Sequence, residues 1–198
     1  GFEVELMIGF CREYGYRLAF EDTAFAAIMS GVSSGRYDIG MSGITITEER
    51  RESVDFSAVN HTEDLVLVIH KQSDVKTFED YKNANVGITT GTYAATIIHD
   101  VFPDATVKEF ASIPDTMLAL TQGKIDIVLN DVSYYTCMKW EGMNVDRLEE
   151  PYTTTDFGIA FKKGENAQLR EQMNAFIAKI KENGEFDFNF EKLDVIAA

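Results

Sequence analysis

Apolar residues recur at helical spacing in several stretches of this chain of 198 residues. In the first stretch, Val4, Met7, Cys11 and Tyr14 fall on one helical face, and Gly15 follows at a position where glycine commonly ends a helix. The same reasoning predicts helices over residues 3–14, 25–33, 93–101, 112–120, 131–140 and 167–183.

Short apolar runs lie between these helices and predict strands. The predicted strands cover residues 17–20, 39–41, 86–88 and 125–129. Strands that alternate with helices indicate an α/β fold with largely parallel sheets. Two further apolar runs, at residues 65–69 and 157–161, lack helical spacing and are predicted to be extended connections.

One local pattern occurs twice. A helix is followed by Gly, a basic residue, an apolar residue, Asp and Ile at residues 35–39, and again at residues 123–127. One interpretation is a common turn between a helix and a strand, because glycine usually follows a helix C-terminus. The other is that the chain forms two similar lobes, each with its own sheet, and we favour this second interpretation.

The extended connections suggest where the lobes meet along the chain. If the chain leaves the first lobe at one connection and returns at the other, the second lobe is a contiguous insertion. We therefore predict a first lobe of residues 1–66 and 162–198, a second lobe of residues 67–161, and hinges near residues 65–70 and 157–161. Paired connections make a hinge, and a ligand cleft between the lobes is the expected consequence.

The formal net charge of -15 argues against nucleic acid or an anionic membrane surface as a partner, because both bind positive patches. The simplest interpretation of the charge is solubility. No apolar run reaches the roughly 18 residues that a membrane span needs. The chain begins within a predicted helix and shows no signal peptide, so we expect that a leader and some structural sequence are missing.

The sequence offers no catalytic or metal-binding motif of a familiar kind, so no enzyme activity, metal or cofactor is expected. His61, His70 and His99 lack the spacing of metal ligands. Cys11 and Cys137 form no CxxC motif, and a disulfide is open on their number alone. Both cysteines lie on predicted apolar helix faces, which favours buried free thiols.

The most informative stretch is SGITITEERRESVDFS, residues 42–57. Thr47 is suited to cap a short helix, although Arg50 stands where a complete capping box has Glu or Gln. Thr45 offers a hydroxyl and a backbone N–H, and Arg50 offers a planar fork that fits a carboxylate. Strand ends in open α/β sheets commonly bind ligands. On these residues alone, Arg50 is either a ligand-binding residue or a surface arginine of a helix.

This stretch resembles the signature of a known family. SGITITEER followed by VDFS is similar to the family 3 extracellular solute-binding proteins, the amino-acid receptors of ABC importers. Three weaker matches follow the family's order: GFEVEL at residues 1–6, GT at 91–92 and QGKIDIVLND at 122–131. The resemblance extends to about Leu193. It implies a venus-flytrap fold, the type II periplasmic binding protein, with two α/β lobes, two hinge strands and a first strand that would precede Gly1.

The resemblance also implies ligand-binding residues in the first lobe. Arg50 would pair with the α-carboxylate of an amino acid, and Thr45 would donate to the same group. Gly43 would offer its backbone carbonyl to the α-ammonium group. Phe25 matches an aromatic residue that packs on the ligand, although without the resemblance it would be interpreted as core. Residues 58–61 (AVNH) depart from the Pro and aromatic residues usual for the family, which leaves specificity open.

In the second lobe, Thr92 and Tyr93 lie at a predicted helix N-terminus, where backbone N–H groups suit a carboxylate. Asp131 matches the carboxylate that pairs with the ligand's ammonium group, whereas without the resemblance it would be a helix N-cap. Thr89 and Asn130 are weaker candidates. They would either bond a polar, glutamine-like ligand side chain or serve the structure alone.

The resemblance implies an extracytoplasmic receptor that delivers one free amino acid to an ABC permease. We expect a monomer in the periplasm, or at the cell surface as a lipoprotein or a permease-fused domain. Two alternatives stay open: a ligand-sensing domain of a signalling protein, and a periplasmic dehydratase-like enzyme on the same scaffold. For the enzyme, Asp131 and Glu21 are the candidate acid or base residues.

Overall fold

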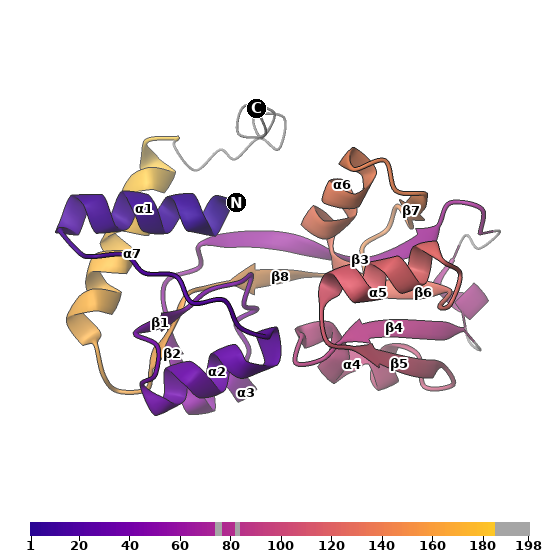
Figure 1. Ribbon diagram of the computed structural model, residues 1–198, viewed down its shortest axis with the longest axis horizontal. Helices are drawn as coiled ribbons and strands as arrows, with labels where there is room; N and C mark the ends of the chain where they lie inside the picture. Colours follow the sequence, from indigo (N-terminus) through magenta and orange to yellow (C-terminus); the bar gives the residue numbers. More distant parts are fainter. Residues whose placement is uncertain (74–76, 82–83, 185–198) are drawn as a thin grey trace. The chain divides into compact units, whose positions relative to one another are not determined.

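The computed structural model describes residues 1–73, 77–81 and 84–184, and the chain forms two compact units (Figure 1). Unit 1 comprises Gly1–Asp22, Gly31–Asn60 and the chain from Gly158 onward, and unit 2 comprises Thr23–Ser30 and His61–Phe157. The main transitions between the units therefore follow Asn60 and Phe157, whereas the lobe limits expected from the sequence follow residues 66 and 161.

Unit 1 contains a three-stranded sheet with the strand order β1-β9-β2, and both strand pairs are antiparallel. Its elements are α1 (Phe2–Tyr14), the second part of α2 (Phe25–Ser34), β1 (Ile39–Gly40), α3 (Glu48–Ser53), β2 (Val54–Phe56), β9 (Ala160–Lys162) and α7 (Ala167–Glu182). None of the described helices of the chain is long and apolar enough to cross a membrane.

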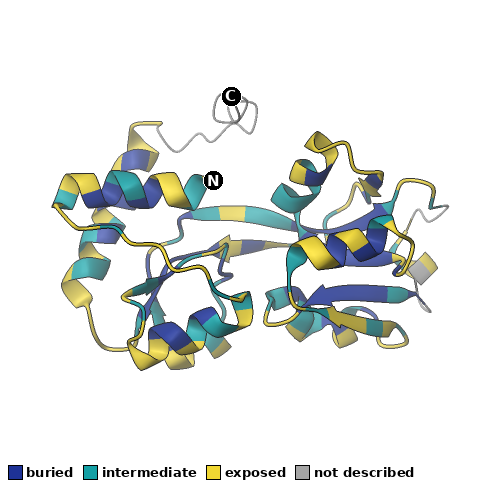
Figure 2. Ribbon diagram, in the orientation of Figure 1, coloured by how far each residue is buried: buried dark blue, intermediate teal, exposed yellow. Residues whose placement is uncertain are grey.

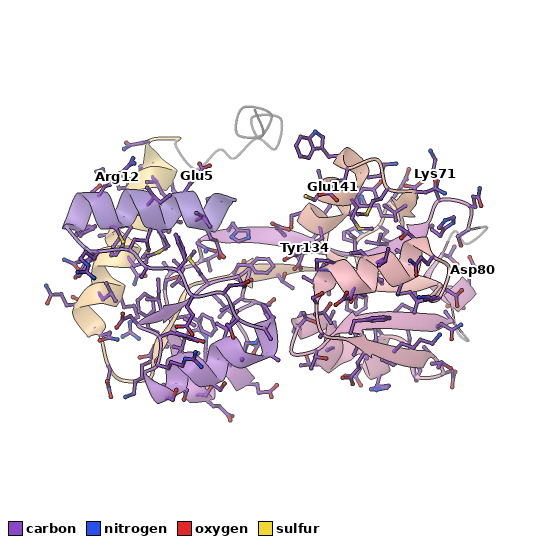
Figure 3. All side chains as sticks on the ribbon, in the orientation of Figure 1. Glu5, Arg12, Lys71, Asp80, Tyr134 and Glu141 are labelled. Atoms are coloured by element: carbon purple, nitrogen blue, oxygen red, sulfur yellow. The ribbon has the colours of Figure 1, made fainter. Side chains whose placement is uncertain are left out.

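Helix α1 supplies much of the core of unit 1. Its buried face carries Leu6, Met7, Phe10 and Cys11, whereas its other face is exposed, as Figure 3 shows for Glu5 and Arg12. The ring of Phe10 meets Phe176 of α7 edge to face, with 5.8 Å between the centroids. The two helices thus pack through their apolar stripes, which is the usual source of helix stability in a folded protein.

Unit 2 is built on a larger sheet with the strand order β5-β4-β6-β3-β7, and β8 also pairs with β3. Its strands are β3 (His61–His70), β4 (Asn85–Thr89), β5 (Thr106–Phe110), β6 (Ile127–Asp131), β7 (Val145–Arg147) and β8 (Thr153–Phe157). Its other elements are the short 3-10 helix η1 (Phe78–Tyr81) and the helices α4 (Tyr93–Val101), α5 (Ile113–Thr121) and α6 (Val132–Trp140).

Both faces of this sheet are covered. Leu65, Leu67 and Ile69 of β3 share one core cluster with α4, whereas Val66 and Val68 share another with α5 and α6. Successive side chains of a strand point to opposite faces, so an unbroken apolar run is the expected pattern for a strand buried on both sides. The run at 65–69, expected to be an extended connection, is therefore central to unit 2 (Figure 2).

The expected parallel sheets are only partly present. Among the described strand pairs, β4 is parallel to β5 and to β6, and every other pair is antiparallel. The parallel pairs occur where α4 and α5 provide the crossovers that parallel strands require. The run that was expected to be an extended connection, β3, has three antiparallel partners, β6, β7 and β8.

Two other local expectations were wrong. The predicted strand at residues 17–20 has no regular structure, and Phe20 is 55% exposed. No described strand pairs with this segment, so its backbone has no ladder to join. Cys137, expected to be buried, is exposed, because α6 buries the neighbouring Met138 instead; Cys11 is buried, and both thiols are free.

The repeated sequence pattern corresponds to one turn that is present in each unit. Gly35 and Gly123 have positive φ angles of 79° and 67°. In both turns the glycine N–H donates to the third residue before it, over 3.0 Å, and the next N–H donates to the fifth residue before it, over 2.9 Å. These bonds satisfy the last carbonyl groups of the helix, which explains why the pattern needs glycine at this position.

Candidate functional site

The loop between β1 and α3 holds two of the candidate residues, Gly43 and Thr45, both in unit 1. Gly43 has a φ of 58°, and its N–H donates to the Glu3 carboxylate over 3.0 Å. The carbonyl oxygen of Ile44 accepts from the Gly158 N–H over 3.1 Å, and Thr45 is buried. The loop is therefore fixed from two sides, by α1 and by the residue that follows β8.

Helix α3 places Arg50 beside this loop. The Thr47 hydroxyl accepts from the Arg50 N–H over 3.1 Å, so Thr47 is the N-cap that the sequence predicted. The Arg50 side chain is half-buried, and its Nη1 donates to the Thr45 carbonyl oxygen over 2.7 Å. Thr45 and Arg50 thus come together, and the fork of N–H donors on a guanidinium group matches the geometry of a planar anion.

Glu3 and Asn60 are two residues that the sequence reasoning missed. One carboxylate oxygen of Glu3 accepts from Gly43, and the other accepts from the side-chain amide of Asn60 over 3.1 Å. Asn60 is fully buried and is the last residue of unit 1 before β3. The signal in the sequence that could have identified Glu3 is its position within the GFEVEL segment.

In unit 2, five of the candidates lie at or directly after the carboxyl ends of β4 and β6: Thr89, Thr92, Tyr93, Asn130 and Asp131. These strands are parallel neighbours, with Val86 opposite Ile127, so the residues that follow them lie at the same edge of the sheet. At that edge, the Thr92 hydroxyl donates to the Thr89 carbonyl over 2.8 Å and accepts from the Ala95 N–H as the N-cap of α4. The helix N-terminus beside the half-buried Tyr93 is thereby ordered.

The side chains of Thr89 and Asn130 are buried and bonded within unit 2. The Thr89 hydroxyl lies 2.9 Å from the Thr116 hydroxyl of α5. Asn130 Oδ1 accepts from the Asp131 N–H over 2.9 Å. These bonds give both residues a structural role at the end of their strands.

Asp131 ends β6 and stands at the N-cap position of α6, half-buried. Phe25, also half-buried, begins α2 and belongs to the segment that groups with unit 2. The next residue, Ala26, lies so close to Gly91 that a Cβ on Gly91 would be 2.9 Å from its Cα atom. The first turn of α2 and the loop after β4 are therefore neighbours.

The candidate acid or base residue of unit 1 lies on its surface. Glu21, the other candidate acid or base, is 53% exposed in its side chain and pairs with Arg36. Tyr37 also donates to it over 3.3 Å. Within residues 1–73, 77–81 and 84–184, no three His, Cys, Asp or Glu side chains gather closely enough to hold a metal ion.

Comparisons with known proteins agree on one family. A sequence model described as bacterial extracellular solute-binding proteins, family 3, matches residues 1–192. A probable histidine-binding protein of Neisseria gonorrhoeae is 29% identical over 199 residues, covering 97% of this chain and 74% of the relative. The ABC transporter glutamine-binding protein GlnH of Bacillus subtilis (strain 168) is 32% identical over 162 residues, covering 81% of this chain and 59% of the relative.

Solved structures show the same similarity. An ancestral arginine-binding protein bound to arginine has a TM-score of 0.88 and 29% identity, covering 97% of this chain and 87% of that one. The ancestral amino-acid-binding protein AncCDT-1, a precursor of cyclohexadienyl dehydratase, has a TM-score of 0.89 and 26% identity, covering 97% and 84%. These likenesses confirm the α/β fold with two lobes that the sequence predicted.

Proposed function

The chain belongs to the bacterial extracellular solute-binding proteins of family 3, and on this premise we propose that it binds one free amino acid outside the cytoplasm and delivers it to the permease of an ABC transporter. The observation that carries the proposal is the half-buried guanidinium group of Arg50, which the Thr45 carbonyl holds at 2.7 Å. A planar cation fixed in this way suits the carboxylate that every free amino acid carries.

Unit 1 contributes three groups in this proposal. Arg50 pairs with the α-carboxylate, and Thr45 donates to the same group. The Gly43 carbonyl accepts from the α-ammonium group. Support comes from the loop itself, because Gly43 and Thr45 are held in place by bonds to Glu3 and Arg50 within the protein. A preorganised site loses less free energy to ordering when the ligand binds.

Unit 2 contributes the remaining groups. The ordered N-terminus of α4, at Thr92 and Tyr93, offers backbone N–H groups and a favourable dipole to the carboxylate. Asp131 pairs with the α-ammonium group, and Phe25 packs on the ligand. An acid and a base, contributed by Asp131 and Arg50, match the two opposite charges of an amino acid.

We propose a polar amino acid as the ligand and a monomer as the receptor. The relatives are named for histidine and glutamine, and the ancestral structure holds arginine. Since the buried Thr89 and Asn130 are already bonded to their own unit, they are weak candidates for contacts with a glutamine-like side chain.

An enzyme activity is not part of the proposal. AncCDT-1 is a precursor of a dehydratase, yet its own description is an amino-acid-binding protein. Of the two candidate acid or base residues, Glu21 is paired with the exposed Arg36, and Asp131 is assigned to the ammonium group. Our proposal is therefore binding without turnover.

Isothermal titration calorimetry against each standard amino acid tests the proposal. We expect one molecule of a polar amino acid to bind per chain with micromolar affinity or better, and Arg50→Ala and Asp131→Ala to remove this binding. The absence of binding by a protein shown to be folded by circular dichroism would contradict the proposed function. Binding that survives both substitutions would contradict the assigned residues alone.

A further inference from the structure

Glu63 of β3 carries a carboxylate that is largely buried. Its side chain is 16% exposed, and His61 Nε2 lies 3.4 Å from one of its oxygens. The other oxygen accepts from the N–H of Ser133, in the first turn of α6, over 3.1 Å. Within residues 1–73, 77–81 and 84–184, no lysine or arginine pairs with Glu63. A buried charge is usually paired with its opposite, so this carboxylate suits a cation that a ligand brings.

The carboxyl group of Glu63 is held in its charged form. Burial raises the pKa of Glu63, but the hydrogen bonds from His61 and from the side chain and backbone of Ser133 outweigh it, and the pKa lies below its ordinary value of 4.5. An anion at a helix N-terminus is also favoured by the helix dipole. A carboxylate has about four acceptor positions, so the donors from His61 and Ser133 leave it able to accept from a ligand as well.

The register of the sheet places Glu63 at the candidate site of unit 2. Leu65 of β3 pairs with Asp131, the last residue of β6, and Leu65 belongs to the core cluster against which Tyr93 of α4 packs. Glu63 lies two residues before Leu65 and therefore on the same face of β3. This is the face that α4 covers, at the edge where β6 ends and α6 begins. Figure 3 labels Tyr134, which marks the first turn of α6.

Thr155 of β8 is a second polar residue on this face, because it pairs directly with Glu63 in the antiparallel register. Thr155 is 8% exposed, and its hydroxyl is the buried side-chain oxygen that has no hydrogen-bond partner among the described residues. Buried polar groups normally have such a partner. A cationic group with several N–H donors could supply one to Glu63 and one to Thr155, whereas an apolar group could supply none.

We infer that Glu63 binds the cationic side chain of the ligand, so that the amino acid is a basic one, of the arginine or lysine type. The inference rests on the proposed function, in which other groups hold the α-carboxylate and the α-ammonium group. A guanidinium or ammonium group forms charge-assisted hydrogen bonds with the Glu63 carboxylate. A neutral side chain at the same position would leave a buried anion without a counter-charge, and Glu63 therefore selects against neutral amino acids.

Calorimetry of the wild-type protein with two matched pairs of ligands tests the selection. L-citrulline has nearly the shape of L-arginine without its charge, and L-norleucine has the carbon chain of L-lysine without its ammonium group. Since charge-assisted hydrogen bonds are roughly twice as strong as neutral ones, the basic member of at least one pair is expected to bind at least about tenfold more tightly than its neutral partner. This comparison needs no variant, so it tests the inference whether or not a substituted protein folds.

The variant Glu63→Gln assigns the selection to one residue. Glutamine keeps the size of the side chain and an acceptor oxygen for Ser133 but removes the charge. Glu63→Gln is expected to weaken binding of the basic amino acid at least about tenfold and to bring the two members of the pair within about threefold of each other. The control Asp64→Asn removes the charge of the next residue, which bonds Thr154 on the other face of the strand pair, and the preference should remain. Thermal unfolding checks that both variants are folded.

The outcomes separate the inference from the proposed function. A wild-type protein that binds a neutral amino acid, such as L-glutamine, as tightly as any basic one overturns the inference while the receptor function stands. A preference for the basic amino acid that survives in folded Glu63→Gln also overturns it, because another group would then select the charge. If the folded wild-type protein binds no amino acid at all, the proposed function and the inference fail together.

Discussion

Arg50 donates from Nη1 to the carbonyl oxygen of Thr45 over 2.7 Å, so the guanidinium group is tied to the backbone of the loop that precedes its own helix. The same arginine provides the N–H that Thr47 accepts. Its backbone and its side chain are thus both fixed by the loop of residues 45–47. Ligand binding by Arg50 should therefore depend on the shape of its side chain as well as on its charge.

We therefore predict that Arg50→Lys fails almost as completely as Arg50→Ala. A lysine keeps the charge but cannot both reach the Thr45 carbonyl and present a planar pair of donors to a carboxylate. Loss of a buried, hydrogen-bonded charge partner costs about 2–5 kcal/mol, or at least about 30-fold in affinity. Calorimetry with the best-binding amino acid measures the effect. The matched control is Arg51→Ala, because Arg51 is exposed and pairs with Glu48 on the surface at 3.6 Å.

Glu3 gives a second prediction, because its carboxylate joins Gly43 to the fully buried Asn60. Glu3→Ala removes the acceptor of both bonds and is expected to destabilise the protein by about 1–3 kcal/mol, with weaker ligand binding because Gly43 is no longer fixed. Chemical denaturation and calorimetry measure the two effects. Glu5→Ala on the exposed face of the same helix should change neither. Equal stability of the two variants would refute a structural role for Glu3.

The bonds of Asp55 lead to a prediction of how the free energy of unfolding depends on pH. Its carboxylate accepts from the Gly164 N–H over 3.0 Å and from Arg170 over 2.6 Å. These bonds, with the Gly164 N–H as the larger cause, hold the pKa of Asp55 below its ordinary value of 3.8, although burial raises it. A group with a lowered folded pKa stabilises the protein above its unfolded pKa and loses this effect as pH falls through the folded pKa.

Asp55→Asn should therefore reduce the free energy of unfolding at pH 7 by about 1.5–3 kcal/mol, the range for hydrogen bonds to charged groups. The difference from wild type should begin to shrink as pH falls below about 4, where the unfolded chain takes up the proton, and should be lost as pH falls further through the lower folded pKa. Urea denaturation between pH 7 and pH 2.5 measures it. A difference that stays constant with pH would show that the packing of Asp55, and not its charge, stabilises the fold.

The sequence predicted the caps and turns that a few neighbouring residues determine. The cap at Thr47, the left-handed turn at Gly15 and the paired turns at Gly35 and Gly123 all follow from local chemistry. The signature around Arg50 is also local, so a short stretch of sequence is enough to indicate the family.

Contacts between distant parts of the chain could not be predicted from the sequence. The strand expected at residues 17–20 needed a neighbouring strand, and β3 took antiparallel partners from more than one later segment. Glu63 and Ser133 are distant in sequence, and so are Glu3 and Asn60. No periodicity records such contacts, because a hydrogen bond between remote residues depends on the register of the whole sheet.

Gly91 supplies the last prediction. It precedes the Thr92 cap and has a φ of 82°, and a Cβ at this position would lie 2.9 Å from the Cα atom of Ala26. Gly142 has a similar φ of 75°, but a Cβ there would meet no atom within 4 Å.

Both Gly→Ala variants are expected to lose about 1–2 kcal/mol of stability, because alanine is strained in the left-handed backbone conformation. Gly91→Ala carries a further overpacking cost of about 1–3 kcal/mol, because backbone atoms cannot yield as a flexible side chain can. Since the displaced loop holds Thr92, ligand affinity should fall in Gly91→Ala and stay at the wild-type level in Gly142→Ala. Denaturation and calorimetry on both variants separate the two costs, and equal destabilisation with equal affinity would mean that the close approach of Ala26 has no energetic consequence.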